Sequence, residues 1–89
     1  METAVRRWED AGSLRQITAR EREVLHLFGA GFGTADVAAR LEISPVTVRN
    51  HAQSILSKLG VHSRLEAVAR GYALGLISLP PREQHIRGR

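Results

Sequence analysis

Residues 44–60 read SPVTVRNHAQSILSKLG, and the apolar residues in this stretch recur at helical spacing. They form a stripe made of Val48, Ala52, Ile55, Leu56 and Leu59. Ser44 is a favourable N-cap, Pro45 suits the first helical position, and Gly60 is a common residue at a helix end. The sequence therefore predicts a helix over about residues 45–59.

The opposite face of this predicted helix carries hydroxyls, amides and two basic side chains, but no acidic residue. Its members are Thr47, Arg49, Asn50, Gln53, Ser54, Ser57 and Lys58. An ordinary solvated helix face usually mixes acidic and basic residues. A helix that enters the major groove of DNA instead needs short polar groups that match base edges, and phosphates would repel carboxylates. The pattern favours contact with duplex DNA over simple solvation.

Two shorter helices are predicted upstream. Thr18 and Glu21 have the spacing of a capping box, and the helix that they open should end at the glycines of residues 29–31. Thr34 is a candidate N-cap for a helix over residues 35–41. Only residues 42–44 separate this helix from the one at 45–59, and such a tight link is typical of a helix-turn-helix pair. The second helix of that pair lies in the major groove.

A fourth helix, over about residues 64–74, should follow a second capping box at Ser63 and Glu66. Its predicted inward stripe contains Leu65, Val68, Ala69 and Tyr72. Two prolines at 80–81 block further helix, so residues 80–89 are predicted to be a flexible basic tail. Residues 1–16 are an extension in which a short helix can form. The expected fold is all-α, with four helices in one domain over residues 17–79.

Composition narrows the class of protein. The chain has 89 residues, which suffice for one small domain, and it has no cysteine and a modest net charge of +4. No apolar run approaches the roughly 20 residues that span a bilayer, and the start lacks a signal segment. We therefore expect a soluble, cytoplasmic protein. Four aromatic residues of the Phe, Trp and Tyr types are too few for a platform that stacks single-stranded bases.

Chemical sites are not indicated. The four histidines are scattered without metal-ligand spacing, and the glycines at 29, 31 and 33 lack the lysine of a phosphate-binding loop. The charged run at residues 20–23 reads as capping and ion-pairing groups, with Glu23 or Glu66 placed to meet Arg64. We expect no enzyme activity, catalytic residue, metal, cofactor or small-molecule ligand, and no membrane partner.

Three blocks of the sequence resemble the LuxR-type (GerE- and NarL-like) helix-turn-helix DNA-binding domain. They are REREVL at 20–25, S-x-x-T-V-R-N-H at 44–51 and K-L-G-V-x-S-R-x-E-A at 58–67, within a likeness over about residues 17–77. The resemblance implies a four-helix domain that regulates transcription. It also implies a third helix that recognises DNA, a fourth helix that forms a dimer, and an inverted-repeat site.

The resemblance implies that Arg49, Asn50 and Gln53 contact DNA. Positions at the starts and on the outer faces of the predicted helices add five further candidates, Thr34, Ser44, Val46, Thr47 and Lys58. Arg49 matches guanine, Asn50 or Gln53 matches adenine, and Val46 can touch a thymine methyl group. The remaining four are candidate phosphate contacts, although Thr34, Ser44 and Thr47 also fit local capping bonds, and Lys58 also fits simple solvation. The candidate dimer seam is Ala67, Gly71 and Leu74, with ordinary core packing as the alternative.

The sequence also departs from the family pattern. Residues 33–37 lack a lysine that relatives often carry before the second helix, and Asp36 adds an acidic group there. This departure keeps open a protein-interaction module derived from the fold, and a promoter-recognition module like sigma region 4 is a further alternative. The expected partners are double-stranded DNA and a second copy of the chain, with RNA polymerase as a further candidate. The chain fits either a stand-alone regulator or the output domain of a response regulator.

Overall fold

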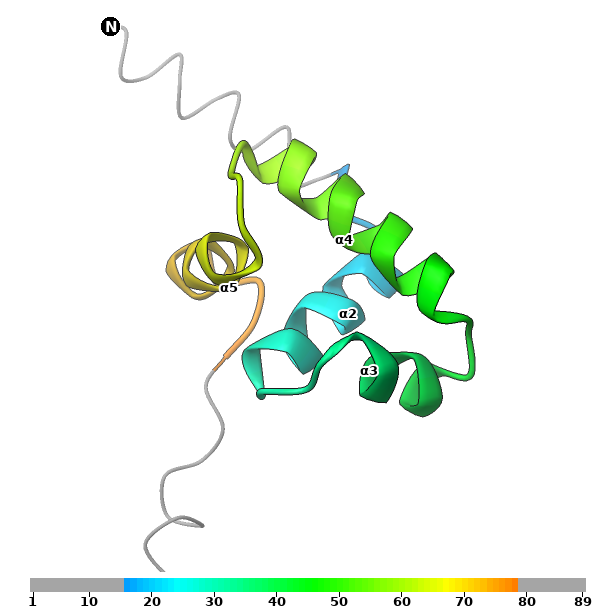
Figure 1. Cartoon of the computed structure of the whole chain (residues 1–89). Helices are drawn as coiled ribbons and strands as arrows, with labels where there is room; N and C mark the ends of the chain where they lie inside the picture. The colour runs from blue at the N-terminus through cyan, green and yellow to red at the C-terminus, as the bar shows by residue number, and fades with distance from the viewer. Residues whose placement is uncertain (1–15, 79–89) are drawn as a thin grey trace, which may run out of the picture.

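A computed structural model describes residues 16–78 of the protein, and within this part it contains four helices and no strand. The helices are α2 (Ala19–Gly29), α3 (Thr34–Leu41), α4 (Pro45–Leu59) and α5 (Arg64–Ala73). The longest, α4, lies across α2 and α3, while α5 packs against α2 and α4 (Figure 1). The predicted all-α, four-helix architecture is confirmed. The predictions for the N-terminal extension up to residue 15 and for the tail at 80–89 lie outside the described residues.

Local capping interactions start two of the helices where the sequence predicts. The Glu21 N–H donates to the Thr18 hydroxyl at 3.0 Å, and the Thr18 N–H donates to the Glu21 carboxylate at 3.0 Å, which completes a capping box. Ser44 accepts a hydrogen bond from the Thr47 N–H at 3.0 Å and Pro45 follows it. Gly60 ends α4 with a φ of 69°, a conformation that glycine adopts without a steric penalty.

Two predicted caps differ in the structure. Helix α3 begins at Thr34 itself, because Gly33 occupies the N-cap position with an extended backbone and its carbonyl accepts from the Val37 N–H. The Thr34 hydroxyl therefore makes no capping bond. At the start of α5, Ser63 caps the Glu66 N–H at 3.1 Å, but the Glu66 carboxylate accepts from the His62 N–H instead of closing a box with Ser63.

The helix-turn-helix link bends at Glu42, which ends α3 in the left-handed region with a φ of 58°. The N–H of Ile43 donates to the Ala38 carbonyl and so satisfies an acceptor that the helix end leaves open. Ser44 then starts α4 directly. The tight turn holds α3 and α4 in contact, as the sequence predicts for a helix-turn-helix pair.

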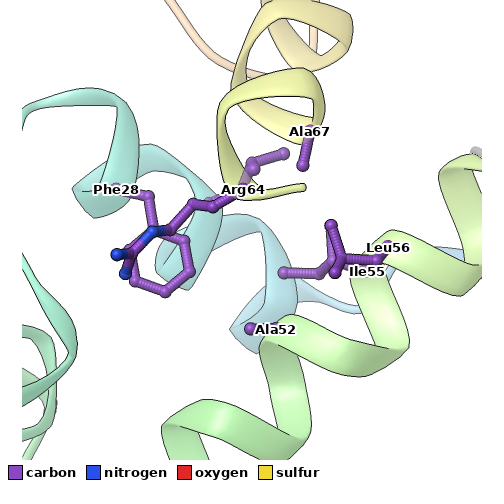
Figure 2. A pocket seen from close by; sticks show the side chains of 7 residues that line it. Phe28, Ala52, Ile55, Leu56, Arg64 and Ala67 are labelled. Carbon is purple, nitrogen blue, oxygen red and sulfur yellow. The ribbon is translucent and has the colours of Figure 1, made fainter. Parts of the chain in front are cut away.

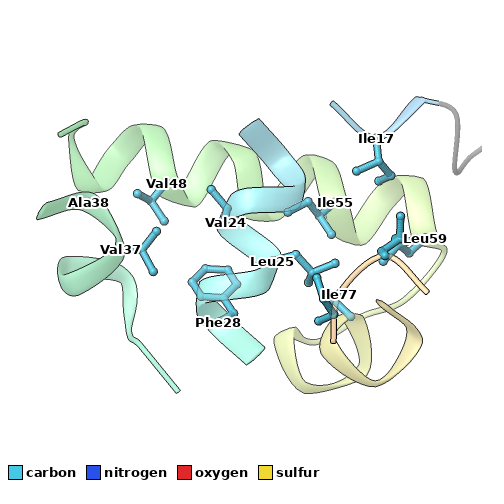
Figure 3. Packing of buried hydrophobic residues seen from close by; sticks show 12 residues of the cluster. Ile17, Val24, Leu25, Phe28, Val37, Ala38, Val48, Ile55, Leu59 and Ile77 are labelled. Atoms are coloured by element: carbon cyan, nitrogen blue, oxygen red, sulfur yellow. The ribbon is translucent and has the colours of Figure 1, made fainter. Parts of the chain in front are cut away.

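The hydrophobic core lies where α2 meets the other three helices, and Figure 3 shows its side chains pointing toward one another. Its members are Ile17, Val24, Leu25, Phe28, Val37, Ala38, Val48, Ile55, Leu59, Ala67, Leu76 and Ile77. The segment after α5 folds back, since the N–H groups of Leu76 and Ile77 both donate to the Gly71 carbonyl. No helix in the described part of the chain is long and apolar enough to cross a membrane.

The orientation of α5 differs from the prediction. Leu65, expected to face inward, is 78% exposed, and Ala69 is also exposed. Ala67 and Gly71 face the core instead. A Cβ atom on Gly71 would come within 2.9 Å of the Leu25 side chain, so a larger residue there would require that side chain to shift. Helix α5 is thus rotated about its axis, so that its small residues face the core and Leu65 faces solvent.

Candidate nucleic-acid interface

The outer face of α4 presents a continuous polar stripe. Its residues are Val46, Arg49, Asn50, Gln53 and Ser57, all of them exposed. Their separations of three and four residues place them on one side of a helix. An α-helix with its side chains is about 10–12 Å across, and the major groove is about 12 Å wide. The helix that carries the stripe therefore has a diameter that suits the groove.

The inner face of the same helix anchors that stripe to the core. Val48 is fully buried and Ile55 is 1% exposed, and both pack among residues of α2 and its neighbours. The exposed positions next to them consequently have a defined direction in space. Among the exposed side chains of α4 none is acidic, and Val46 is its one large exposed hydrophobic residue, at 55%. The arrangement matches what base-edge recognition requires.

The first turn of α4 contains two hydroxyls that bond to each other. The Ser44 and Thr47 side-chain oxygens are 2.9 Å apart, and Ser44 also accepts from the Thr47 N–H. These contacts agree with the local, capping alternative for both residues. A hydroxyl has one donor and two acceptor sites, so a phosphate contact stays compatible with these bonds. Thr34 lies half-buried in the first turn of α3, on the other helix of the pair.

Lys58 has a different environment from the expected one. Its ammonium group lies 2.9 Å and 3.2 Å from the two Glu21 carboxylate oxygens, and 2.7 Å from the Gln16 carbonyl oxygen. The expectation that this side chain reaches outward is therefore wrong in this structure. Sequence reasoning could not find the pair, because Glu21 and Lys58 lie 37 residues apart and each suits its own helix.

The Glu21 carboxylate is buried, with 6% of its side chain exposed. Burial raises its pKa, but hydrogen bonds from the Thr18 N–H, Lys58 and Ser54, together with the charge of Lys58, lower it by more. The net result is a pKa below the ordinary value of 4.5. Glu21 is therefore an ionised, paired carboxylate in the folded protein.

A pH dependence follows from this lowered pKa. Glu21 contributes stability above its unfolded-state pKa, and that contribution is lost as the pH falls from about 4.5 through the folded-state pKa. We expect Glu21→Gln to lack this part of the acid destabilisation. Urea unfolding of both proteins at a series of pH values between about 6 and 3 measures the difference. Parallel loss of stability in the two proteins would contradict the assignment.

Two further arginines, Arg20 and Arg64, contact other side chains of the domain. Arg20 pairs with Glu23 on the surface of α2 at 3.0 Å. The sequence predicted that Arg64 pairs with Glu23 or Glu66, but its guanidinium lies instead over the Phe28 ring, 4.6 Å from the ring centre. Such a contact is a cation–π interaction. It explains why Arg64 packs against the domain in place of pairing with an acid.

Beside that contact lies a small apolar cavity between α2, α4 and α5 (Figure 2). Its lining consists of Leu25, Phe28, Ala52, Ile55, Leu56, Arg64 and Ala67, and its volume of about 20 Å³ matches a single water molecule. The cavity is too small for an organic ligand. Residues 16–78 also contain no group of histidine and acidic side chains that could hold a metal ion.

One stripe on the solvent-exposed side of α5 is apolar, beside the exposed charged residues Arg64, Glu66 and Arg70. Leu65 and Ala69 are exposed and Val68 is half-buried, at separations that place them on one side of the helix. Of the predicted dimer seam, Ala67 and Gly71 are buried within the domain and Leu74 is half-buried. The burial of Ala67 and Gly71 fits the alternative reading, ordinary core packing, while Leu74 stays a candidate for the dimer seam.

The chain is similar to bacterial regulatory proteins in sequence and in structure. Residues 15–70 match the family model described as bacterial regulatory proteins, luxR family. The spore germination protein GerE of Bacillus subtilis is 41% identical over 63 residues, which cover 71% of this chain and 85% of GerE. The solved structure of the transcription factor GerE superposes with a TM-score of 0.68 over 71% of this chain and 94% of that one, at 41% identity.

Longer regulators show the same likeness over part of their length. A probable transcriptional regulatory protein, NarL of Mycobacterium tuberculosis, is 42% identical over 67 residues, and the transcriptional regulatory protein DesR of Bacillus subtilis is 44% identical over 59 residues. The match covers 66% of this chain in both cases, but only 31% of NarL and 30% of DesR. The chain thus spans about a third of these two relatives. Regulation of transcription, and not catalysis, is the activity in their names.

Proposed function

The chain belongs to the luxR family of bacterial regulatory proteins and is a DNA-binding domain of that family, and from this premise we propose that α4 reads a specific operator in the major groove. The observation that carries the proposal is the exposed, acid-free stripe on α4. Its side chains are donors and acceptors of the kinds that match base edges. The core contacts of Val48 and Ile55 hold the stripe outward from the domain.

Four residues of the stripe are candidates for base contacts in this proposal. Arg49 pairs with the O6 and N7 atoms of a guanine, and Asn50 or Gln53 pairs with an adenine. Val46, exposed in the first turn, contacts a thymine methyl group. Ser44, Thr47 and Thr34 contact phosphates, since they lie in the first turns of α4 and α3, where free N–H groups attract anions. Lys58 is left out of the phosphate contacts because Glu21 and Gln16 hold it.

The proposal includes a dimer on DNA that forms through the outward face of α5. Leu65, Val68 and Ala69 form this face, which differs from the seam expected from sequence. An exposed leucine beside small apolar residues gives a flat surface on which a second copy can pack about a two-fold axis. Two recognition helices then meet half-sites about one turn of DNA apart. As a regulator of transcription the protein would act in the bacterial cytoplasm, with RNA polymerase as a further partner.

Replacement of Leu65 by glutamate tests this dimer face. Leu65 is 78% exposed, so the fold should persist, while two carboxylates brought together across the axis repel each other. We expect the variant to bind a single half-site as the wild type does, but to lose at least tenfold in affinity for a two-fold site. Gel-shift titrations of both DNAs, with circular dichroism as the check on folding, measure this. Unchanged affinity for the two-fold site would place the dimer contact elsewhere.

Selection of bound fragments from a random duplex DNA pool, followed by a salt titration of the best fragment, tests the function itself. The expected result is an enriched two-fold motif whose affinity falls steeply as salt rises. Binding without an enriched motif would contradict sequence-specific recognition by α4. Absence of binding at low salt would contradict the DNA-binding role and favour a protein-interaction module.

A further inference from the structure

One lysine joins three separate parts of the fold. The Lys58 ammonium, in the last turn of α4, donates to both carboxylate oxygens of Glu21 in α2 and to the Gln16 carbonyl oxygen just before α2. The same Glu21 carboxylate accepts the Thr18 N–H at 3.0 Å. The cluster thus connects the start of α2 with the far end of the proposed recognition helix, across 37 and 42 residues of sequence.

This pair is unusual in the domain because Glu21 is the one buried charged residue among residues 16–78, while the side chain of Lys58 is 24% exposed. Two core residues, each 6% exposed, flank the cluster in sequence: Leu59 follows Lys58, and Ile17 follows Gln16. A buried ion pair is weak evidence for stability, since the loss of hydration offsets much of the attraction between the charges. Apolar residues of similar volume often stabilise a fold equally well. A pair that contributes little net stability relative to apolar residues can still fix the relative position of the elements that it joins.

The ion pair adds a directional contact between α2 and α4. Apolar contacts are non-directional, whereas hydrogen bonds weaken steeply outside a narrow range of distance and angle. Arg49 lies nine residues before Lys58 on the same helix, about 13.5 Å away along its axis. A tilt of α4 by about 10° would displace one end relative to the other by about 2 Å. Such a movement would break the bonds to Lys58 and would also misplace Arg49 against a base edge.

We propose that Glu21 and Lys58 are positioning residues for DNA recognition, whose part-buried pair sets the orientation of α4 and thereby the preference for the operator over other DNA. The proposal rests on the proposed function of α4. Non-specific binding depends on the charge that a protein presents to phosphates and tolerates small changes in geometry. Base readout requires placement within about 0.5 Å. Loss of the pair should therefore reduce specific binding selectively.

The decisive variant is the double substitution Glu21→Gln with Lys58→Met. The glutamine keeps an acceptor for the Thr18 N–H, the methionine keeps the length of the lysine stem, and no buried charge is left unpaired. We expect a thermal unfolding midpoint close to that of the wild type. The ratio of affinities for the selected operator and for an unrelated duplex should fall at least tenfold, with the non-specific affinity and its salt dependence unchanged.

A matched control is available two residues away on α2. Glu23→Gln makes the same chemical change in the exposed pair with Arg20, whose side chains are 43% and 56% exposed for Arg20 and Glu23 respectively. This variant should keep the wild-type affinity ratio. A simple phosphate contact by Lys58 predicts another outcome for the double variant, namely an equal loss for both DNAs and a salt slope lower by about one unit. That result would overturn the positioning role.

Measurements without DNA separate this proposal from the proposed function. Backbone residual dipolar couplings of the free proteins report the direction of α4 relative to α2, and we expect this direction to change in the double variant but not in Glu23→Gln. A folded double variant with the wild-type helix direction and the wild-type affinity ratio would refute the positioning role. A wild type that prefers no sequence refutes the proposed function instead, while the helix directions still decide whether the pair orients α4.

Discussion

Replacement of Ile55 by aspartate is expected to unfold the domain. Ile55 is 1% exposed and lies in α4 at the centre of the cluster that joins α2, α4 and α5 (Figure 3). Removal of a buried isoleucine side chain costs about 2–5 kcal/mol, and an unpaired buried carboxylate adds about 3–5 kcal/mol. A domain of this size is stable by roughly 3–9 kcal/mol. The far-ultraviolet circular dichroism signal of the helices should therefore be lost at 25 °C.

Gln53→Asp is the matched control for this prediction. It places the same carboxylate two residues earlier on α4, at an exposed position. The expected change is the small difference in helix propensity, a few tenths of a kcal/mol, so the helical signal and the cooperative thermal transition should persist. A cooperative, helical Ile55→Asp protein would show that the core does not depend on the buried face of α4.

Replacement of Arg49 by alanine is the substitution with the largest expected effect on recognition. Arg49 is exposed in the middle of the polar stripe, and a bidentate pair with guanine contributes about 1–3 kcal/mol of discrimination. The affinity for the selected operator should fall by about 5- to 150-fold, and one base position should lose its preference. Fluorescence titration with the operator and with single-base variants measures both effects.

Arg22→Ala is the matched control, since it removes the same charge from another surface. Arg22 lines an open groove with Glu23, His26, Leu27, Leu41 and Leu76, and no residue of α4 takes part in that groove. This variant should keep the base preferences of the wild type. If Arg49→Ala weakens all sequences equally, Arg49 contacts phosphate and the guanine assignment is wrong. If it leaves the affinity unchanged, α4 does not enter the groove as proposed.

The family match also bears on the alternatives that the sequence left open. Membership of the luxR family decides against a sigma region 4-like module. The protein-interaction alternative depends on Asp36 and on the absence of a lysine before α3, and both features lie outside the stripe on α4. The stripe itself has no acidic residue, which is the property that a DNA-binding face needs.

Local features of the fold could be read from the sequence because they depend on residues a few positions apart. The capping box at Thr18 and Glu21, the cap at Ser44 and the end of α4 at Gly60 all occur as predicted. The acid-free face of α4 could be read in the same way, since helical periodicity alone places its members together. These local rules are precise to about one residue: α3 begins at Thr34 and not at residue 35. At Ser63 only one of the two hydrogen bonds of the predicted capping box forms.

Features that only the tertiary structure decides involve partners far apart in the chain. Gly71 lets α5 approach Leu25 closely, and the helix turns its small residues inward and Leu65 outward, against the order of hydrophobicity. Lys58 bonds to Glu21 and Gln16 because the crossing of α4 over α2 brings these groups together. The sequence by itself thus determined which helices form and which face of α4 is polar. The packing of the helices decided which face of α5 is exposed and which groups bond to Lys58. Both depend on the shapes of the helices and on the distances between them, which no local sequence pattern encodes.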